Sequence, residues 1–177
     1  LDELLAKWDR FNYQSRQMSE LVRKNGISHK VIMEKMRRSK GVKRVEVKGE
    51  RFTAVNNDCV EETQSMPENS VDLILSSIPF SNHYEYTPSY NDFGHNPDND
   101  KFFEQMDFLT PELLRILKPG RIAAIHVKDR ILFGNATGDG MPTVDPFSDM
   151  TVMHFTKHGF GYMGRIVVLT DVVRENN

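Results

Sequence analysis

The sequence predicts an α/β fold in which a mostly parallel sheet is flanked by helices. The runs "VDLIL" at residues 71–75 and "IAAIHV" at 122–127 are short and almost wholly apolar, as in strands buried on both faces of a sheet. Helical spacing of apolar residues occurs between these runs and after the second, so strands and helices alternate along the chain. This order of elements implies right-handed crossovers and parallel pairing. The length of 177 residues suffices for one domain with a real core, or for part of a larger one.

The N-terminal part predicts a helical arm or linker over residues 1–41, followed by the globular domain over 42–177. Apolar residues recur at near-helical spacing among charges over 2–25, and a second helix is expected over 28–41. From residue 42 the pattern changes to alternation, which predicts a hairpin or a pair of short strands. The chain begins without methionine and ends directly after an apolar stretch, so we expect a domain that is incomplete at its C-terminus.

A short helix and a long loop are predicted on either side of the first buried strand. Residues 56–70, "NNDCVEETQSMPENS", can hold a turn and a short helix. Residues 81–100 are too polar and too rich in turn-forming residues for a regular element, and loops of this length are usually functional or disordered. Their aromatic content argues against plain disorder.

The second half predicts one or two helices, a strand, a loop, a helix and a third strand. Residues 101–117 restore helical spacing, and Thr110-Pro111 is a fresh N-cap and first-turn signal that predicts a kink or a second helix. Residues 133–147 form a glycine-rich loop without the Gly-Lys-Ser/Thr ending of a phosphate-binding loop. Asp145-Pro146, in "VDPFSDM", is interpreted as the cap of a helix that runs to about His158, and residues 165–173 predict the third strand.

Composition restricts the class of protein. The hydrophobic fraction of 38% and the charged fraction of 27% are ordinary for a soluble chain, and no apolar run approaches the roughly 18 residues of a membrane span. The single cysteine, Cys59, cannot form an intramolecular disulfide, and no signal-peptide pattern is present, so a cytoplasmic location is expected.

The charge is unevenly distributed along the chain. Residues 1–51 carry 14 Lys and Arg against 7 Asp and Glu, whereas the remainder carries 9 against 18, so a net charge of −2 divides into +7 and −9. The basic blocks can contact phosphates, although a solvated helix face explains each residue taken singly. The asymmetry as a whole makes nucleic acid a reasonable partner.

The strand at 71–75 leads into Ser76, Ser77, Ile78, Pro79 and Phe80, which together can form a shelf at the strand end. Pro79 holds Ile78 extended and turns the strand end into a fixed set of carbonyls. Ser77 offers a hydroxyl that can accept a hydrogen bond, and Phe80 offers a flat face for a planar ring. Acceptors beside a stacking surface suit a planar heterocycle that carries an amino group.

These residues resemble the amino-methylating DNA methyltransferases, whose signature is Asp, Asn or Ser, then Pro-Pro, then an aromatic residue, after an apolar strand. Here "SIPF" stands in that place, with Ile78 where the family has its first proline. The upstream "NNDCVEETQSMPENSVDLIL" and the downstream "LTPELLRILKPGRIAAIHV" are similar to the family's segments before and after the motif. The match covers roughly residues 52–170, in the order of the group whose cofactor motif follows the catalytic motif.

The resemblance implies a partial class I methyltransferase-like (Rossmann-like) fold and S-adenosylmethionine as cofactor. It implies that a flipped base stacks on Phe80 and places its exocyclic amine against the Ser77 hydroxyl and the Ile78 carbonyl, with Pro79 holding the shelf. It also implies cofactor contacts by Asp58, Ser76 and Ser77, and the alternative role of Asp58 is that of a turn former. The glycine-rich cofactor motif is absent and is expected after residue 177.

Several other side chains have competing interpretations. In the loop over residues 81–100, four residues are expected to bind substrate: Asn82, His83, Tyr84 and Tyr86. The alternative is a surface loop in which the aromatic rings pack against one another. His126 is interpreted as a core histidine. His154 and His158 are explained by a helix face, and no structural metal is expected.

Three functions remain open. The leading prediction is a site-specific DNA methyltransferase that acts on N6 of adenine or N4 of cytosine, from a phage or a restriction-modification system, with further domains in the same chain. The second is a methyltransferase that acts on RNA or on a protein glutamine. The third is a non-catalytic methyltransferase-like domain that binds nucleic acid within a larger protein.

Overall fold

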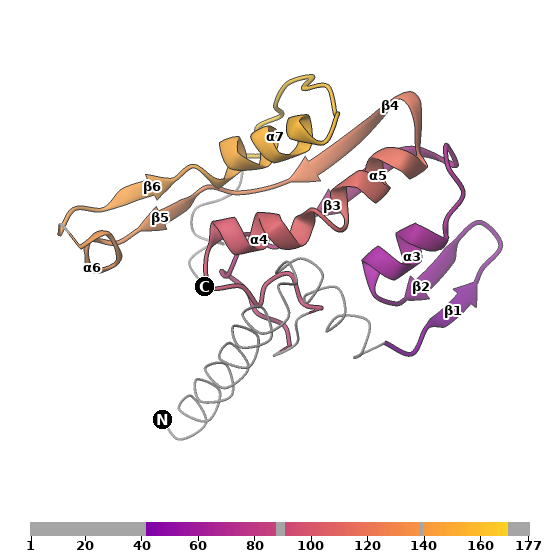
Figure 1. Cartoon of the computed structure of the whole chain (residues 1–177), viewed down its shortest axis with the longest axis horizontal. Helices are drawn as coiled ribbons and strands as arrows, with labels where there is room; N and C mark the ends of the chain where they lie inside the picture. Colours follow the sequence, from indigo (N-terminus) through magenta and orange to yellow (C-terminus); the bar gives the residue numbers. More distant parts are fainter. Residues whose placement is uncertain (1–41, 88–90, 139, 170–177) are drawn as a thin grey trace, which may run out of the picture.

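The computed structural model describes residues 42–87, 91–138 and 140–169 (Figure 1). The predicted helical arm and the last residues of the predicted third strand lie outside the described residues, and the boundary at 41/42 stays a prediction. The strands and helices are β1 (Val45–Lys48), β2 (Thr53–Asn56), α3 (Cys59–Ser65), β3 (Val71–Ser77), α4 (Asn99–Met106), α5 (Thr110–Ile116), β4 (Leu117–His126), β5 (Arg130–Leu132), α6 (Gly134–Thr137), β6 (Thr143–Asp145) and α7 (Phe147–Lys157).

The centre of the structure is the parallel pair β3 and β4. Its register runs from Leu73 opposite Ile122 to Ser77 opposite His126. The crossover between the two strands contains α4 and α5, which lie along the pair (Figure 1). The prediction of an α/β fold with a parallel sheet and flanking helices is therefore confirmed.

Antiparallel hairpins lie on either side of the parallel pair in the chain. Strands β1 and β2 form the predicted first hairpin, and α3 is the predicted short helix. Strands β5 and β6 form a second hairpin with α6 in its connection. The prediction of a plain loop over 133–147 was wrong, because short strands interrupted by glycine and proline show too little alternation to be recognised.

The hydrophobic core lies between one face of the parallel pair and the helices. Ile74 supplies the buried side chain of β3, and Phe102 of α4 and Phe147 of α7 are fully buried. The two helices predicted at 101–117 are present, since α4 ends at Met106 and α5 begins at Thr110. In the described part of the chain, no helix has the length and apolar character needed to cross a membrane.

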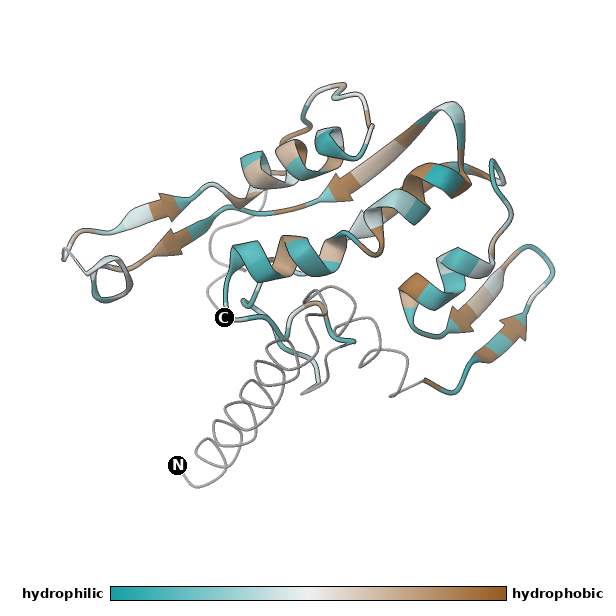
Figure 2. Ribbon diagram, in the orientation of Figure 1, coloured by the Kyte–Doolittle hydropathy of each residue, from teal (hydrophilic) through white to brown (hydrophobic). Residues whose placement is uncertain are grey.

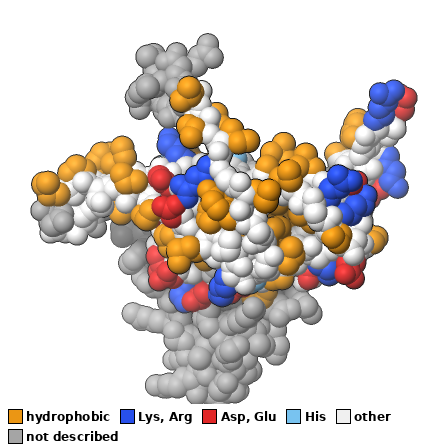
Figure 3. All heavy atoms as spheres, turned by 90° about the horizontal axis from the view of Figure 1, so that it is seen from above, with side chains coloured by type: hydrophobic (Ala, Val, Ile, Leu, Met, Phe, Trp, Pro, Cys, Tyr) orange, Lys and Arg blue, Asp and Glu red, His pale blue; other side chains and the backbone are white. Residues whose placement is uncertain are grey.

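The opposite face of the parallel pair is open among the described residues. Leu73 and Leu75 of β3 are 57% and 77% exposed, and Ile122 of β4 is 57% exposed. The prediction that both strands are buried on both faces was therefore wrong for this part of the chain. Side chains alternate along a strand, and the described helices cover only the face that carries Ile74. Figure 2 shows hydrophobic residues along β4, and Figure 3 shows hydrophobic side chains in patches on the face seen from above.

Three local signals have outcomes different from those predicted. Residues 165–169, the described part of the predicted third strand, are not in a strand, and Ile166 and Leu169 are 95% and 91% exposed. Thr110 does not cap α5, because its hydroxyl pairs with His154 and Leu109 occupies the N-cap position. Asp145 does not cap α7, because Pro146 occupies that position.

Candidate functional site: a hydroxyl, an imidazole and a ring at one sheet edge

The site is built where the two parallel strands end. Ser77 is the last residue of β3 and His126 is the last residue of β4, and the register places them opposite each other. Ser77 Oγ and His126 Nδ1 are hydrogen-bonded at 3.0 Å. In open α/β sheets, ligands bind beyond the carboxyl ends of the strands, and both side chains are exposed at that edge.

The residues after Ser77 are held in place by their side chains. Ile78 is 5% exposed and belongs to the core, so burial anchors the backbone at this position. Phe80 is half-buried, and its ring lies edge-on to His126, with centroids 5.8 Å apart, and to Phe147, with centroids 6.4 Å apart. The predicted shelf therefore has a fixed backbone, an oriented hydroxyl and an adjacent ring.

The chain turns immediately after the shelf. Ser81 is fully buried and has a φ of 56°, in the left-handed region, and the N–H of His83 donates to the carbonyl of Phe80 at 3.2 Å. His83 and Tyr84 pack edge-to-face with centroids 4.4 Å apart. Tyr84 and Tyr86 are 54% and 75% exposed, so both residues are open to solvent.

Asn82 is fixed by contacts to two other parts of the chain. Its Nδ2 donates to the carbonyl of Pro97 at 3.0 Å, and its Oδ1 accepts from Nη1 of Arg130 at 2.8 Å. The Asn82 side chain therefore links the loop after the shelf to Pro97 and to Arg130. Its predicted contact with a substrate stays a prediction.

The Arg130 side chain that contacts Asn82 belongs to an ion-pair network. Arg130 of β5 and Asp145 of β6 form an ion pair of 2.6 Å with side chains 15% and 7% exposed. Nδ2 of Asn99 donates to both carboxylate oxygens of Asp145, at 2.9 and 3.0 Å, and Nη2 of Arg130 donates to Oδ1 of Asn99 at 3.0 Å. The network joins the β5–β6 hairpin, the start of α4 and the loop after the shelf, and the sequence prediction did not include it.

The side chains of Asp58 and Ser76, which were predicted with Ser77 to contact the cofactor, do not lie with that of Ser77 at the strand end. Asp58 is buried at the N-terminus of α3, where its Oδ1 accepts from the N–H groups of Val60 and Glu61, and its Oδ2 accepts from Nδ2 of Asn91 at 2.6 Å. Asp58 is therefore a helix cap, close to the alternative role as a turn former. Ser76 is exposed one residue before Ser77, so its side chain points to the opposite face of the sheet.

The sequence prediction of the shelf was local, and it omitted His126. The interpretation of His126 as a core histidine was wrong, since it is exposed and bonded to Ser77. One signal was available: Ser77 and His126 each follow an apolar run, and residues that end neighbouring parallel strands meet at one edge.

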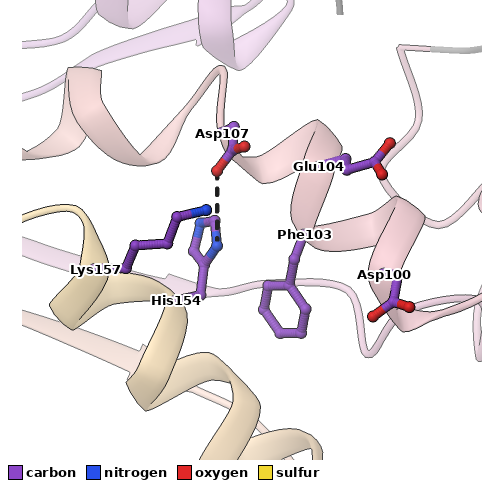
Figure 4. A pocket seen from close by; sticks show the side chains of 6 residues that line it. All are labelled: Asp100, Phe103, Glu104, Asp107, His154 and Lys157. Atoms are coloured by element: carbon purple, nitrogen blue, oxygen red, sulfur yellow. Dashed lines mark ion pairs between the residues drawn. The ribbon is translucent and has the colours of Figure 1, made fainter. Parts of the chain in front are cut away.

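A second group of polar side chains lies away from this edge, where α7 packs on the junction of α4 and α5. Nε2 of His158 is 2.7 Å from Oδ1 of Asp107, and Nδ1 of His154 is 3.9 Å from the same oxygen. The pKa of His154 is lowered to about 4, mainly by burial and then by the charge of His158, with a smaller contribution from Lys157, and Asp107 opposes this shift. An adjoining hollow of about 330 Å³ is lined by Asp100, Phe103, Glu104, Asp107, His154 and Lys157 (Figure 4).

Comparisons with known proteins yield a structural similarity. No protein-family model matches the chain, and no curated protein matches it. A solved structure from Thermus thermophilus, described as a "Putative DNA Modification Methylase", is similar, with 28% sequence identity and a TM-score of 0.44. The similarity covers 59% of this chain and 39% of that protein, so the chain spans well under half the length of that protein.

Proposed function

We propose that this chain contributes the base-binding and amine-orienting part of a site-specific DNA methyltransferase, which methylates N6 of adenine or N4 of cytosine. The observation that carries the proposal is the bonded pair of Ser77 and His126 at the sheet edge, with the ring of Phe80 beside it. The resemblance of "SIPF" and its flanking segments to the amino-methylating family supports the same reaction class.

The shelf suits an exocyclic amine for a chemical reason. When the Ser77 hydroxyl donates to Nδ1 of His126, its oxygen keeps two lone pairs, which can accept from an amine N–H. The carbonyl of Ile78 is the second acceptor that the family resemblance implies. Two acceptors that hold both N–H groups draw the nitrogen lone pair out of conjugation with the ring, which makes the nitrogen a better nucleophile. Positioning and electrostatic stabilisation then supply the acceleration.

Ser77 and His126 also offer a route for a proton. An amine nitrogen that gains a methyl group must lose one proton. The Ser77 hydroxyl can accept this proton while it passes its own to Nδ1 of His126, provided that the imidazole is neutral at that nitrogen. Phe80 contributes binding, because stacking of a base on an aromatic side chain is worth about 1–3 kcal/mol.

The described residues fit only part of what S-adenosylmethionine requires. This cofactor would supply an electrophilic methyl group. Among the described residues, Ser77 lies at the edge where the proposal puts the amine, whereas Ser76 points to the opposite face of the sheet and both carboxylate oxygens of Asp58 are engaged by the α3 backbone and Asn91. The described residues therefore fit the amine side of the chemistry and do not form a site for the adenosine part.

The engaged carboxylate of Asp58 favours a second candidate, a methyltransferase-like domain that binds nucleic acid without catalysis. The two candidates make different predictions for the same preparation. Both require DNA binding that depends on Phe80, but only the enzyme requires methyl transfer that depends on Ser77.

The test is transfer of a labelled methyl group from S-adenosylmethionine to unmethylated genomic DNA by the full-length protein. Phe80→Ala should lower kcat/KM about 5- to 150-fold, the equivalent of one lost stacking contact. Ser77→Ala and His126→Gln should lower kcat more than they change KM. The matched controls Phe133→Ala and His95→Gln alter an exposed ring and a histidine that contacts Glu85, and they should match the wild type.

Each outcome selects between the candidates. Methyl transfer that is unaffected by both Phe80→Ala and Ser77→Ala would refute the proposed site. DNA binding that needs Phe80, without methyl transfer by the wild type, would replace the enzyme with the binding domain.

A further inference from the structure

Two histidines of α7 are arranged as a pair of nitrogen ligands. His154 and His158 are four residues apart, which places them on one face of the helix, and their ring centroids are 4.6 Å apart. His154 lies in the last turn of α7 and His158 is its C-cap residue, whose backbone N–H bonds to the carbonyl of His154. The helix backbone therefore holds the Cα and Cβ atoms of His154 and His158 in fixed positions without a bound ligand.

A carboxylate from another helix completes the group. Asp107 is the C-cap residue of α4, and its backbone N–H bonds to carbonyls of the last turn. The ligand atoms of Asp107, His154 and His158 all lie within 4.8 Å of one another. A tetrahedral zinc site with bonds of about 2.0–2.1 Å holds its ligand atoms roughly 3.3 Å apart, so small side-chain movements would suffice.

A hydrogen-bonded link between helices explains only part of this arrangement. The contact of 2.7 Å between His158 and Asp107 is an ordinary hydrogen bond, but Nδ1 of His154 is 3.9 Å from the same carboxylate oxygen, beyond hydrogen-bonding range. In Figure 4, Asp107 and His154 nevertheless point toward each other across the edge of the hollow.

The remaining nitrogen of His154 has the partner that a metal ligand needs. Nε2 of His154 is 2.9 Å from Oγ1 of Thr110, which is fully buried. If Nε2 donates to Thr110, the lone pair of Nδ1 faces Asp107 and His158. Ligating histidines commonly donate their other ring N–H to a fixed acceptor, which sets the tautomer and the ring orientation.

We propose that Asp107, His154 and His158 bind one divalent transition-metal ion of the Zn²⁺ class. Two imidazoles and one carboxylate are ligands that zinc takes, and a three-ligand set leaves a fourth position for water. Around the adjoining hollow, Asp100 adds a carboxylate and Lys157 an ammonium group, while Glu104 is paired with Lys101 at 2.8 Å, so the case for a cation rests on the three ligands themselves. The ion joins α7 to the junction of α4 and α5. This site is independent of the proposed methyl transfer.

The experiment titrates Zn²⁺ into the purified 177-residue chain after treatment with EDTA and desalting. Competition with a chromogenic chelator measures affinity, and the thermal unfolding midpoint measures stabilisation. We expect one equivalent bound with a dissociation constant of about 1 µM or below, a higher unfolding midpoint, and the visible absorption of tetrahedral Co²⁺ when Co²⁺ replaces Zn²⁺.

The informative variant is His158→Gln, which keeps an N–H donor for Asp107 but removes a nitrogen ligand. Its Zn²⁺ affinity should fall at least about a hundredfold, beyond the usual effect of an outer-shell change. Equal unfolding midpoints of variant and wild type in EDTA would show that the fold is kept. Asp107→Asn is the second variant, with the same expected loss. His95→Gln is the control, because His95 contacts the carboxylate of Glu85 at 3.2 Å without belonging to the three-residue group.

Two results would overturn the proposal: no saturable binding of either metal by the wild type, or unchanged affinity in both His158→Gln and Asp107→Asn. An affinity lost equally in the His95→Gln control would also overturn it, since the bound ion would then lie elsewhere.

Discussion

Replacing Asp145 with alanine should lower the free energy of unfolding by about 3–5 kcal/mol, although Asp145 lies outside the proposed shelf. Its carboxylate is buried and is held by two partners. Oδ2 accepts from Nη2 of Arg130 at 2.6 Å and from Nε at 3.1 Å, while Asn99 donates to both oxygens. Alanine would leave the Arg130 guanidinium, itself only 15% exposed, without its counter-charge.

The magnitude follows from the kind of group that loses its partner. Each hydrogen bond to a charged group is worth about 1.5–3 kcal/mol, but bonds that share one carboxylate do not add. Removal of one member of a buried ion pair is expected to cost about 3–5 kcal/mol, because it leaves an uncompensated buried charge. Small domains have about 5–15 kcal/mol of total stability, so the loss is a large part of the whole.

The assay is urea unfolding of a double-mutant cycle with Asp145→Ala, Arg130→Met and the combined variant. The coupling energy should be about 2 kcal/mol or more, since the double variant removes both charges together. The pair Lys101 and Glu104 is the control: its side chains are 41% and 50% exposed, and its coupling should stay below about 0.5 kcal/mol. A loss under about 1 kcal/mol for Asp145→Ala, or a coupling no larger than the control's, would refute the reasoning.

Three further changes test other parts of the structure. In metal-free protein, the stability that depends on neutral His154 should be complete above about pH 6.5 and should decline as the pH falls toward about 4, because His154 is protonated at a higher pH in the unfolded chain than in the folded chain. Urea unfolding at a series of pH values should show this decline, and His154→Gln should reduce it. Thr110→Val should cost about 1–2 kcal/mol, since it removes the hydrogen bond to His154 at a fully buried position, and Thr110→Ser should retain most of that stability in the same assay. Gly94→Ala should cost about 1–3 kcal/mol, because the new Cβ would clash with the carbonyl oxygen of Tyr84; wild-type stability would show that this close approach is wrong.

Local patterns predicted most of the elements and the residues of the shelf, whereas long-range partners could not be predicted from them. The apolar run followed by "SIPF" identifies Ser77 and Phe80 because strand, proline and ring are neighbours in the chain. The ends of two neighbouring parallel strands could be expected at one edge, but the pairing of His126 with Ser77 could not be predicted, because it depends on the register of two strands whose paired residues are 49 positions apart.

The wrong predictions share a physical cause. Helices do start at Thr110-Pro111 and directly after Asp145-Pro146, as predicted, but neither Thr110 nor Asp145 caps its helix, because tertiary partners bind both side chains. The apolar residues of β3 indicate a strand, but hydrophobicity alone does not say whether one face or both will be covered. Leu75 is apolar and yet exposed among the described residues for this reason.

The separation of Ser77 and His126 has a consequence for the order of events during folding. The parallel ladder can close only after the crossover with α4 and α5 has been brought together, and non-local pairing of this kind loses its loop-closure entropy early. The shelf sequence alone cannot place Ser77 against an imidazole. Ser77 and His126 therefore meet only when the ladder closes, so the site cannot form before the parallel pair does.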